Sequence, residues 1–164
     1  MSTVRRLMTT TAPASVILIR IAVGAVFLSE GIQKFLFPNE LGAGRFIKIG
    51  IPAPEVMGPF VGLVEIVCGS LIIVGLLTRL AAILLIIDMC VALISTKLPI
   101  LLGHGFWRFS LSKLSSYGFW SMAHEARSDF AMLLGSILLL IGGAGAWSLD
   151  AQLAANKQRD EKPR

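Results

Sequence analysis

The chain has 164 residues, of which 55% are hydrophobic and only 15% are charged. Its mean hydropathy of +0.77 is too high for a soluble domain, which must maintain a polar surface. A transmembrane helix takes roughly 20 apolar residues, so the length fits about four crossings and leaves no room for a separate soluble catalytic domain. The net charge of +5 does not indicate nucleic-acid binding, because the basic residues form no stripe and lie in loops and at the chain ends.

Four apolar stretches predict four transmembrane helices within a single membrane domain, residues 14–151. The expected helices cover residues 14–37, 56–77, 79–98 and 125–147. They should be helical because lipid offers the backbone no hydrogen-bond partners. The very short connection at Thr78-Arg79 makes the second and third helices antiparallel neighbours. The predicted fold class is therefore an all-α integral membrane protein, an antiparallel four-helix bundle.

The connection between the third and fourth helices is predicted to lie at the membrane interface. Its aromatic residues are Phe106, Trp107, Phe109, Tyr117, Phe119 and Trp120. Aromatic side chains of this kind concentrate at the level of the lipid headgroups. The charged tail, residues 152–164, is predicted to be disordered.

Lysines and arginines favour a cytoplasmic location for both chain ends. The N-terminal segment, residues 1–13, carries Arg5 and Arg6, and the side it shares with the tail holds more basic residues than the opposite loops. The difference disappears when Lys34, Lys97 and Arg127, near the opposite helix ends, are included.

Each predicted helix carries one stripe of small and polar residues at steps of three and four. The stripes are Arg20, Gly24, Phe27, Gly31 and Lys34; Gly58, Gly62, Glu65 and Gly69; Ala81, Leu85, Asp88, Ala92 and Ser95; and Glu125, Asp129, Met132, Ser136, Leu139 and Gly143. Charged side chains in a membrane usually face the interior of a bundle, so these stripes predict the four faces that meet. Small residues on them allow close approach of the backbones.

The ionisable residues are predicted to converge on a polar pocket toward the outer face. The candidate catalytic residues are Glu30, Lys34 and Glu65, and the candidate pocket residues are Asp129, Arg127, His104 and Trp107. Cationic side chains there would attract an anion or a quinone oxygen, while the carboxylates handle protons. A purely structural ion-pair network explains the same pattern, and both interpretations stay open.

Three further charges, Arg20, Asp88 and Arg79, are predicted to be structural. Arg20 is long enough either to approach Asp88 or to reach the inner headgroups. Cys68 and Cys90 form no metal-binding spacing, and we expect small buried hydrophobes rather than a redox pair. The sequence carries no signal for a metal, haem, flavin or iron–sulfur cluster.

Three segments of the chain resemble the DoxX family of small bacterial and archaeal membrane proteins. The matching segments are 28–35 (LSEGIQKF), 62–65 (GLVE) with Gly69 and 78–82 (TRLAA), and 143–150 (GAGAWSLD), within a similarity that runs from about Ile17 to Ala151. The resemblance implies a four-helix protein of the cytoplasmic membrane, connected with quinone-linked redox systems such as thiosulfate:quinone oxidoreduction or the response to oxidative stress. By the same resemblance, Glu30, Lys34, Glu65 and Arg79 are signature positions.

Three functions follow as hypotheses. The first is a subunit of a quinone-linked redox complex, which holds quinone or an anion at the outer pocket and leaves electron transfer to partner subunits. The second is a structural or assembly subunit without catalysis, and the third is a small proton-coupled exporter. Whether the chain itself belongs to an enzyme stays open, and membrane lipid and other subunits are the expected partners.

Overall fold

The computed structural model describes residue 10 and residues 12–160 of the chain. In that part the chain is helical, apart from one isolated β-bridge between Phe106 and Phe109. The helices are α2 (Val16–Leu36), α3 (Ala43–Ile49), α4 (Pro54–Val74), α5 (Thr78–Ala92), the π-helix η1 (Leu93–Lys97), α6 (Leu98–Leu102), α7 (Phe119–Gly142) and α8 (Leu149–Asp160).

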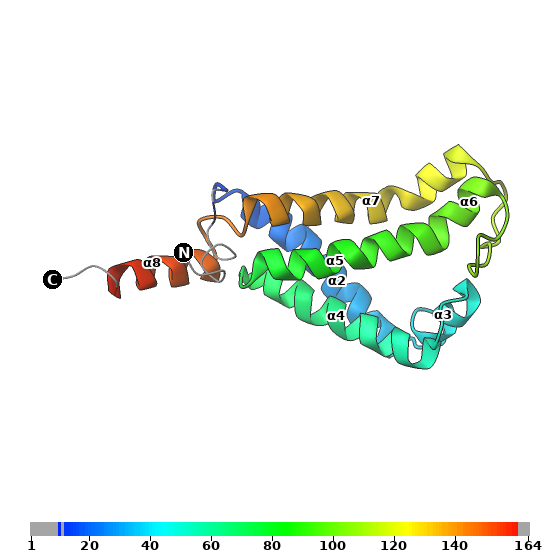
Figure 1. Cartoon of the computed structure of the whole chain (residues 1–164), viewed down its shortest axis with the longest axis horizontal. Helices are drawn as coiled ribbons and strands as arrows, with labels where there is room; N and C mark the ends of the chain where they lie inside the picture. The colour runs from blue at the N-terminus through cyan, green and yellow to red at the C-terminus, as the bar shows by residue number, and fades with distance from the viewer. Residues whose placement is uncertain (1–9, 11, 161–164) are drawn as a thin grey trace.

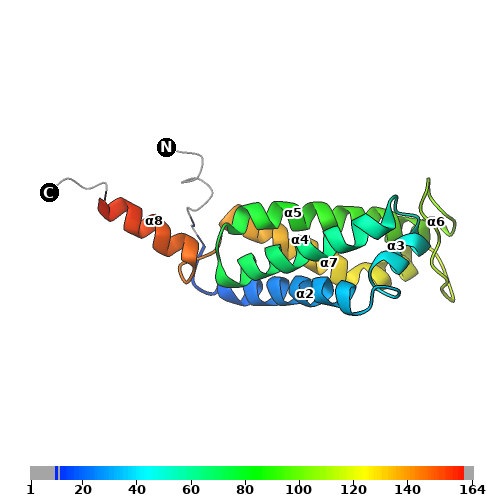
Figure 2. The same ribbon diagram turned by 90° about the horizontal axis from the view of Figure 1, so that it is seen from below.

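The four long helices α2, α4, α5 and α7 lie side by side, and the chain reverses direction from each to the next (Figures 1 and 2). Helix α2 packs closely against α4, and α5 packs closely against α7. The two pairs diverge toward one end of the bundle (Figure 1). We call this the loop end, because it carries α3, α6 and the loop of residues 103–118. The opposite, terminal end carries the start of α2, the α4–α5 turn and the start of α8.

Three helical segments are long and apolar enough to cross a membrane. They are α2, α4 and the continuous stretch Thr78–Leu102, which joins α5, η1 and α6. The most apolar window of each segment is only 33% buried. The rest is an outward surface of residues such as Leu18, Leu63 and Ile87, which contacts lipid. The chain is thus a multi-pass membrane protein.

The predicted interior stripes are confirmed by burial in full on α4 and in part on the other helices, where Lys34, Asp88, Ala92, Glu125, Asp129 and Met132 are only half-buried. Arg20, Gly24, Phe27 and Gly31 are buried on α2, and the whole predicted stripe is buried on α4. The two backbones approach so closely that a Cβ added at Gly31 would lie 2.6 Å from the carbonyl oxygen of Gly62. The small residues therefore set the distance between α2 and α4.

Several helix bounds differ from the sequence-based expectation. Helix α4 ends at Val74 rather than 77, because Gly75 adopts a left-handed conformation with φ +71° and is the C-cap of the helix. Helix α7 begins at Phe119, well before residue 125, and ends at Gly142, where Gly143 (φ +78°) turns the chain out of the helix. The apolar run alone does not reveal these ends, since glycine conformation decides them.

The prediction of a disordered tail is wrong for residues 152–160, which continue α8. Asp150 lies in the first turn of this helix, and the segment is rich in alanine, leucine, glutamine and lysine, all good helix formers. Figures 1 and 2 show α8 extending away from the bundle. The expected N-terminal segment, residues 1–13, and the end of the tail, residues 161–164, lie mostly or wholly outside the described residues.

The two cysteines do not face each other across α4 and α5. Cys68 is buried in the core, as expected, whereas Cys90 is exposed on the outside of α5, so the expectation of two buried cysteines is wrong for Cys90. Both are free thiols.

Candidate functional site

A cavity of about 390 Å³ opens between the two helix pairs where they diverge toward the loop end. Its walls come from α2, α4, α5, η1 and α7, and α3 with its flanking residues contributes the side nearest the loop end. The charged residues that line it are Glu30, Lys34, Arg45, Glu65, Asp88, Lys97, Glu125, Arg127 and Asp129. Apolar side chains such as Phe27, Met89 and Met132 line the remainder. The cavity is thus large enough for a small molecule and combines charge with apolar surface.

An ion pair between α2 and α4 forms one wall of the cavity. The Nζ atom of Lys34 lies 2.6 Å from Oε2 of Glu65, and the two side chains are only 11% and 4% exposed. This is the convergence that the stripes predict. Glu30, one helical turn before Lys34, also lines the cavity but is exposed.

Asp88 completes this part of the wall from α5. Its carboxyl group faces Glu65 and lies close enough to Lys34 for electrostatic attraction. The Oδ2 atom is buried and receives no hydrogen bond from an N–H or hydroxyl group of the described residues, while the carboxyl group of Glu65 lies within hydrogen-bonding reach of Asp88. A buried carboxylate oxygen without a donor is costly, so it calls for a ligand, a water or a proton. We predicted Asp88 as a structural charge; its position in the cavity makes it a site residue as well.

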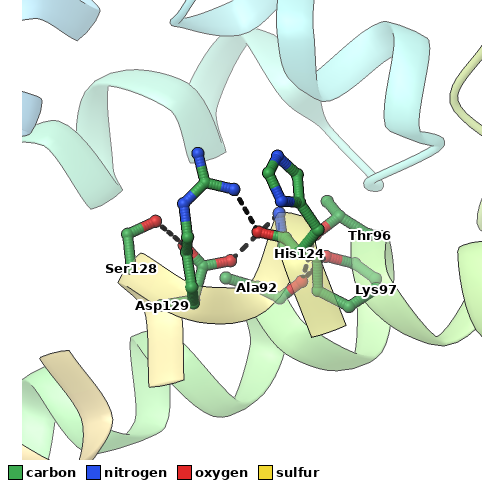
Figure 3. A network of polar contacts seen from close by, with 8 residues as sticks. Ala92, Thr96, Lys97, His124, Ser128 and Asp129 are labelled. Carbon is green, nitrogen blue, oxygen red and sulfur yellow. Dashed lines mark hydrogen bonds and ion pairs between the residues drawn. The ribbon is translucent and has the colours of Figure 1, made fainter. Parts of the chain in front are cut away.

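A second ion pair, shown in Figure 3, joins η1 to α7. The Nζ atom of Lys97 lies 3.2 Å from Oδ2 of Asp129. Asp129 therefore lines the cavity as predicted, and its ion-pair partner is Lys97. Arg127 stands at the exposed rim, where it donates a hydrogen bond to the carbonyl oxygen of His124.

The π-helix η1 explains why sequence periodicity does not reveal Lys97 as a site residue. Pro99 follows η1 and lacks the N–H that would hydrogen-bond to the carbonyl of Ser95 in an α-helix. The wider turn of a π-helix shifts the phase of the side chains, and the hydroxyl groups of Ser95 and Thr96 both donate to the carbonyl oxygen of Ala92. A proline directly after the predicted end of a membrane helix is the signal that points to such a shift.

His104 and Trp107 do not belong to the site. Both side chains are exposed, with Trp107 at 83%, and neither lines the cavity. The short β-bridge between Phe106 and Phe109 turns Trp107 outward, with φ +53°.

Arg20 lies at the terminal end and neither approaches Asp88 nor reaches toward headgroups. It is 2% exposed, and its guanidinium donates to the carbonyl oxygens of Ile72 (2.9 Å), Ile73 (2.6 Å), Ala144 (3.1 Å) and Trp147 (2.6 Å). These groups include the last carbonyls of α4, which have no partner within the helix. Arg20 therefore ties α2 to the ends of α4 and to the loop before α8.

Two other charges also stabilise the terminal end. The carboxylate of Asp150 accepts hydrogen bonds from the backbone N–H groups of Leu77 (2.9 Å) and Thr78 (3.1 Å), and so caps α5 from another helix. Arg79 donates to the carbonyl oxygen of Ile141 at 3.1 Å, near the end of α7. Sequence analysis did not single out Asp150 as a charge with a role, although it closes the last of the three matching segments.

Comparisons with known proteins agree with the sequence resemblance. The DoxX family profile matches residues 15–98. The uncharacterized membrane protein Rv3486 of Mycobacterium tuberculosis is 54% identical over 149 residues, which cover 91% of this chain and 87% of that protein. No solved structure gives a significant match. The chain belongs to the DoxX family of membrane proteins.

Proposed function

We propose that this DoxX-family protein binds the headgroup of a quinone in the cavity and serves as a membrane subunit of a redox complex. The observation that carries the proposal is the buried Oδ2 atom of Asp88, which faces the cavity and receives no hydrogen bond from the described residues. The protonated carboxyl of Asp88 can donate a hydrogen bond to a quinone oxygen, or the carboxylate can accept one from a quinol hydroxyl.

The surrounding groups suit the same ligand. Lys34 and Lys97 supply ammonium donors on different walls, and quinone oxygens are hydrogen-bond acceptors. Phe27, Met89 and Met132 offer apolar and polarizable surface for a planar ring. Reduction of the quinone to quinol takes up two protons and two electrons. Carboxyl groups of the cavity would pass on the protons, and a flavin- or metal-containing partner subunit would supply the electrons.

The proposal includes α7 as a fourth transmembrane helix. Its 24 residues span about 36 Å at 1.5 Å per residue, enough for the hydrocarbon core. Glu125, Arg127 and Asp129 lower its hydropathy, but all three line the cavity near the loop end instead of facing lipid. We place the terminal end at the cytoplasmic face of the inner membrane, and the aromatic loop of residues 103–118 at the opposite interface.

The test is equilibrium binding of 2-methyl-1,4-naphthoquinone to the protein in quinone-free nanodiscs, measured by calorimetry. Asp88→Asn and Lys34→Met should each weaken binding about tenfold or more, as expected for loss of a hydrogen bond that involves a charged group. Glu40→Gln is the matched control, because Glu40 is exposed and does not line the cavity. Failure of the wild-type protein to bind saturably, or equal binding by all variants, would overturn the proposal.

The non-catalytic alternative rests on a different observation, the 2.6 Å pairing of Lys34 with Glu65. Two groups that satisfy each other need no ligand. If the protein only organises a larger complex, Glu65→Gln should lower the amount of assembled complex recovered in mild detergent and leave activity per complex unchanged. A proton-coupled exporter would instead show transport in liposomes that Glu30→Gln or Glu65→Gln abolishes.

A further inference from the structure

Helices α2 and α7 touch at one place and then separate. The contact lies between Val23 and Gly135, where a Cβ added to the glycine would be only 2.5 Å from Cγ2 of Val23. Val23 is buried there at 2% exposure. From this contact the two helices diverge toward the loop end (Figure 1), and they share few contacts along their length.

The cavity reaches the side of the bundle in the space where α2 and α7 separate. Val26 and Glu30 on α2 line the cavity, yet both are exposed, with Val26 at 40%. On α7, Ser128 and Met132 line the cavity, and Ser128 is exposed whereas Met132 is half-buried. A residue that is both a cavity wall and exposed marks a place where the cavity meets the surface. We call these four residues the lateral opening.

The depth of the lateral opening places it in hydrocarbon. Val26 lies ten residues from either end of α2, Val16–Leu36, or about 15 Å at 1.5 Å per residue. The hydrocarbon core of a bilayer is about 30 Å thick, so Val26 lies near its middle. The exposed side of α2 carries no charged residue before Glu30. It is formed by residues such as Ile19, Ala25 and Val26.

The loop end is covered more completely than the side. Phe46 and Ile49 of α3 are buried and line the cavity there. The N–H of Ser110 donates to the carbonyl oxygen of Ile49 at 2.8 Å, which joins the loop of residues 103–118 to α3. Arg45 and Arg127 mark the exposed rim at this end, and Val91 on α5, which is 48% exposed, also lines the cavity. Water and small solutes reach the cavity past this rim, whereas a hydrocarbon chain has its favourable environment at the lateral opening.

We infer that the ligand of the cavity is a membrane-soluble quinone with a prenyl tail, whose ring lies beside Lys34 and Asp88 and whose tail leaves through the lateral opening into the bilayer. This inference rests on the proposed function and specifies its substrate class and its route of access. A tail that remains in lipid keeps its apolar surroundings, so only the ring exchanges its environment on binding.

The test compares two probes, a menaquinone with a prenyl tail and the tail-less 2-methyl-1,4-naphthoquinone, each titrated into the protein in quinone-free nanodiscs. Val26→Trp fills the lateral opening from α2, and Ser128→Trp fills it from α7. Both positions are exposed, so a larger side chain fits without disturbing the core. The matched control is Ile21→Trp, because Ile21 is exposed on α2 but does not line the cavity.

We expect Val26→Trp and Ser128→Trp to weaken binding of the tailed quinone about tenfold, with less than about threefold effect on the tail-less one. Ile21→Trp should change neither. Equal effects of a blocking substitution on both probes, or no effect on either, would overturn lateral access. A wild-type protein that binds the tail-less probe but not the tailed one would do the same and leave the proposed function standing, whereas failure to bind either probe would remove the proposed function itself.

Discussion

The two ends of the bundle bury charge in opposite ways. At the terminal end, the guanidinium of Arg20 makes four hydrogen bonds to carbonyl groups, and both carboxylate oxygens of Asp150 accept from backbone N–H groups. At the loop end, the charged groups surround a cavity, and Oδ2 of Asp88 has no donor among the described residues. Hydrogen bonding therefore separates Arg20 and Asp150 from Asp88, although Nε of Arg79 and Oγ1 of Thr78 at the terminal end are also buried without a partner among the described residues.

The largest expected effect is at Arg20. Arg20→Met removes four hydrogen bonds to carbonyl groups, of which only that of Ile72 keeps another donor among the described residues, the N–H of Gly75, and it leaves Asp150 without its nearby cation, so we expect a loss of roughly 3–5 kcal/mol in the free energy of unfolding. Denaturant unfolding in detergent measures this loss. Arg79→Met is the matched control, because it removes one hydrogen bond, to Ile141, at a more exposed site, and should cost about 1 kcal/mol. Similar losses in the two variants would show that the terminal end does not depend on Arg20 in the way its contacts imply.

A smaller effect is expected at Asp150. Asp150→Ala removes the cap of α5, which typically costs about 1–2 kcal/mol. Asp150→Asn keeps one acceptor oxygen in place and should lose less. The same unfolding measurement separates the two substitutions. If alanine and asparagine cost equally, the charge of Asp150 next to Arg20 matters more than its cap geometry.

The bundle and most of its polar cavity can be predicted from sequence, because the spacing of residue types along each helix shows which of its faces is buried. Stripes of glycine and charge at helical spacing mark the buried faces of α2 and α4, since lipid penalises charge and close packing requires small residues. The same spacing correctly brings Lys34 to Glu65.

What sequence does not reveal depends on backbone groups and on irregular helix geometry. The partners of Arg20 are carbonyl oxygens, which carry no side-chain signal. Lys97 reaches Asp129 only because a π-helix shifts the phase of its side chain ahead of Pro99. His104 and Trp107 are predicted as pocket residues from the aromatic loop, but both are exposed and neither lines the cavity.

The smallest expected change in stability is at Glu65, and it bears most directly on the comparison between the two ends. In Glu65→Gln, the amide oxygen still accepts a hydrogen bond from Lys34, and Lys34 keeps the nearby carboxylate of Asp88. We therefore expect the free energy of unfolding to fall by about 1 kcal/mol, which is typical of a weakened hydrogen bond and less than the cost of a buried charge without a partner. Lys34→Met should cost more, because it leaves Glu65 and Asp88 facing each other without a cation.

Ligand-linked stability extends this test to function. A molecule that binds only the folded protein raises the free energy of unfolding by RT ln(1 + L/Kd), where L is the concentration of free ligand, so the melting temperature rises with the logarithm of concentration and affinity. If the cavity binds quinone, 2-methyl-1,4-naphthoquinone should raise the melting temperature of the wild-type protein. It should raise that of Glu65→Gln less, because the substitution weakens the contact that positions the ammonium group of Lys34. The two ends would be alike if Glu65→Gln lost as much unfolding free energy as Arg20→Met and if quinone changed the melting temperature of neither the wild-type protein nor Glu65→Gln. The charges of the cavity would then serve the assembly of the bundle, as those at the terminal end do.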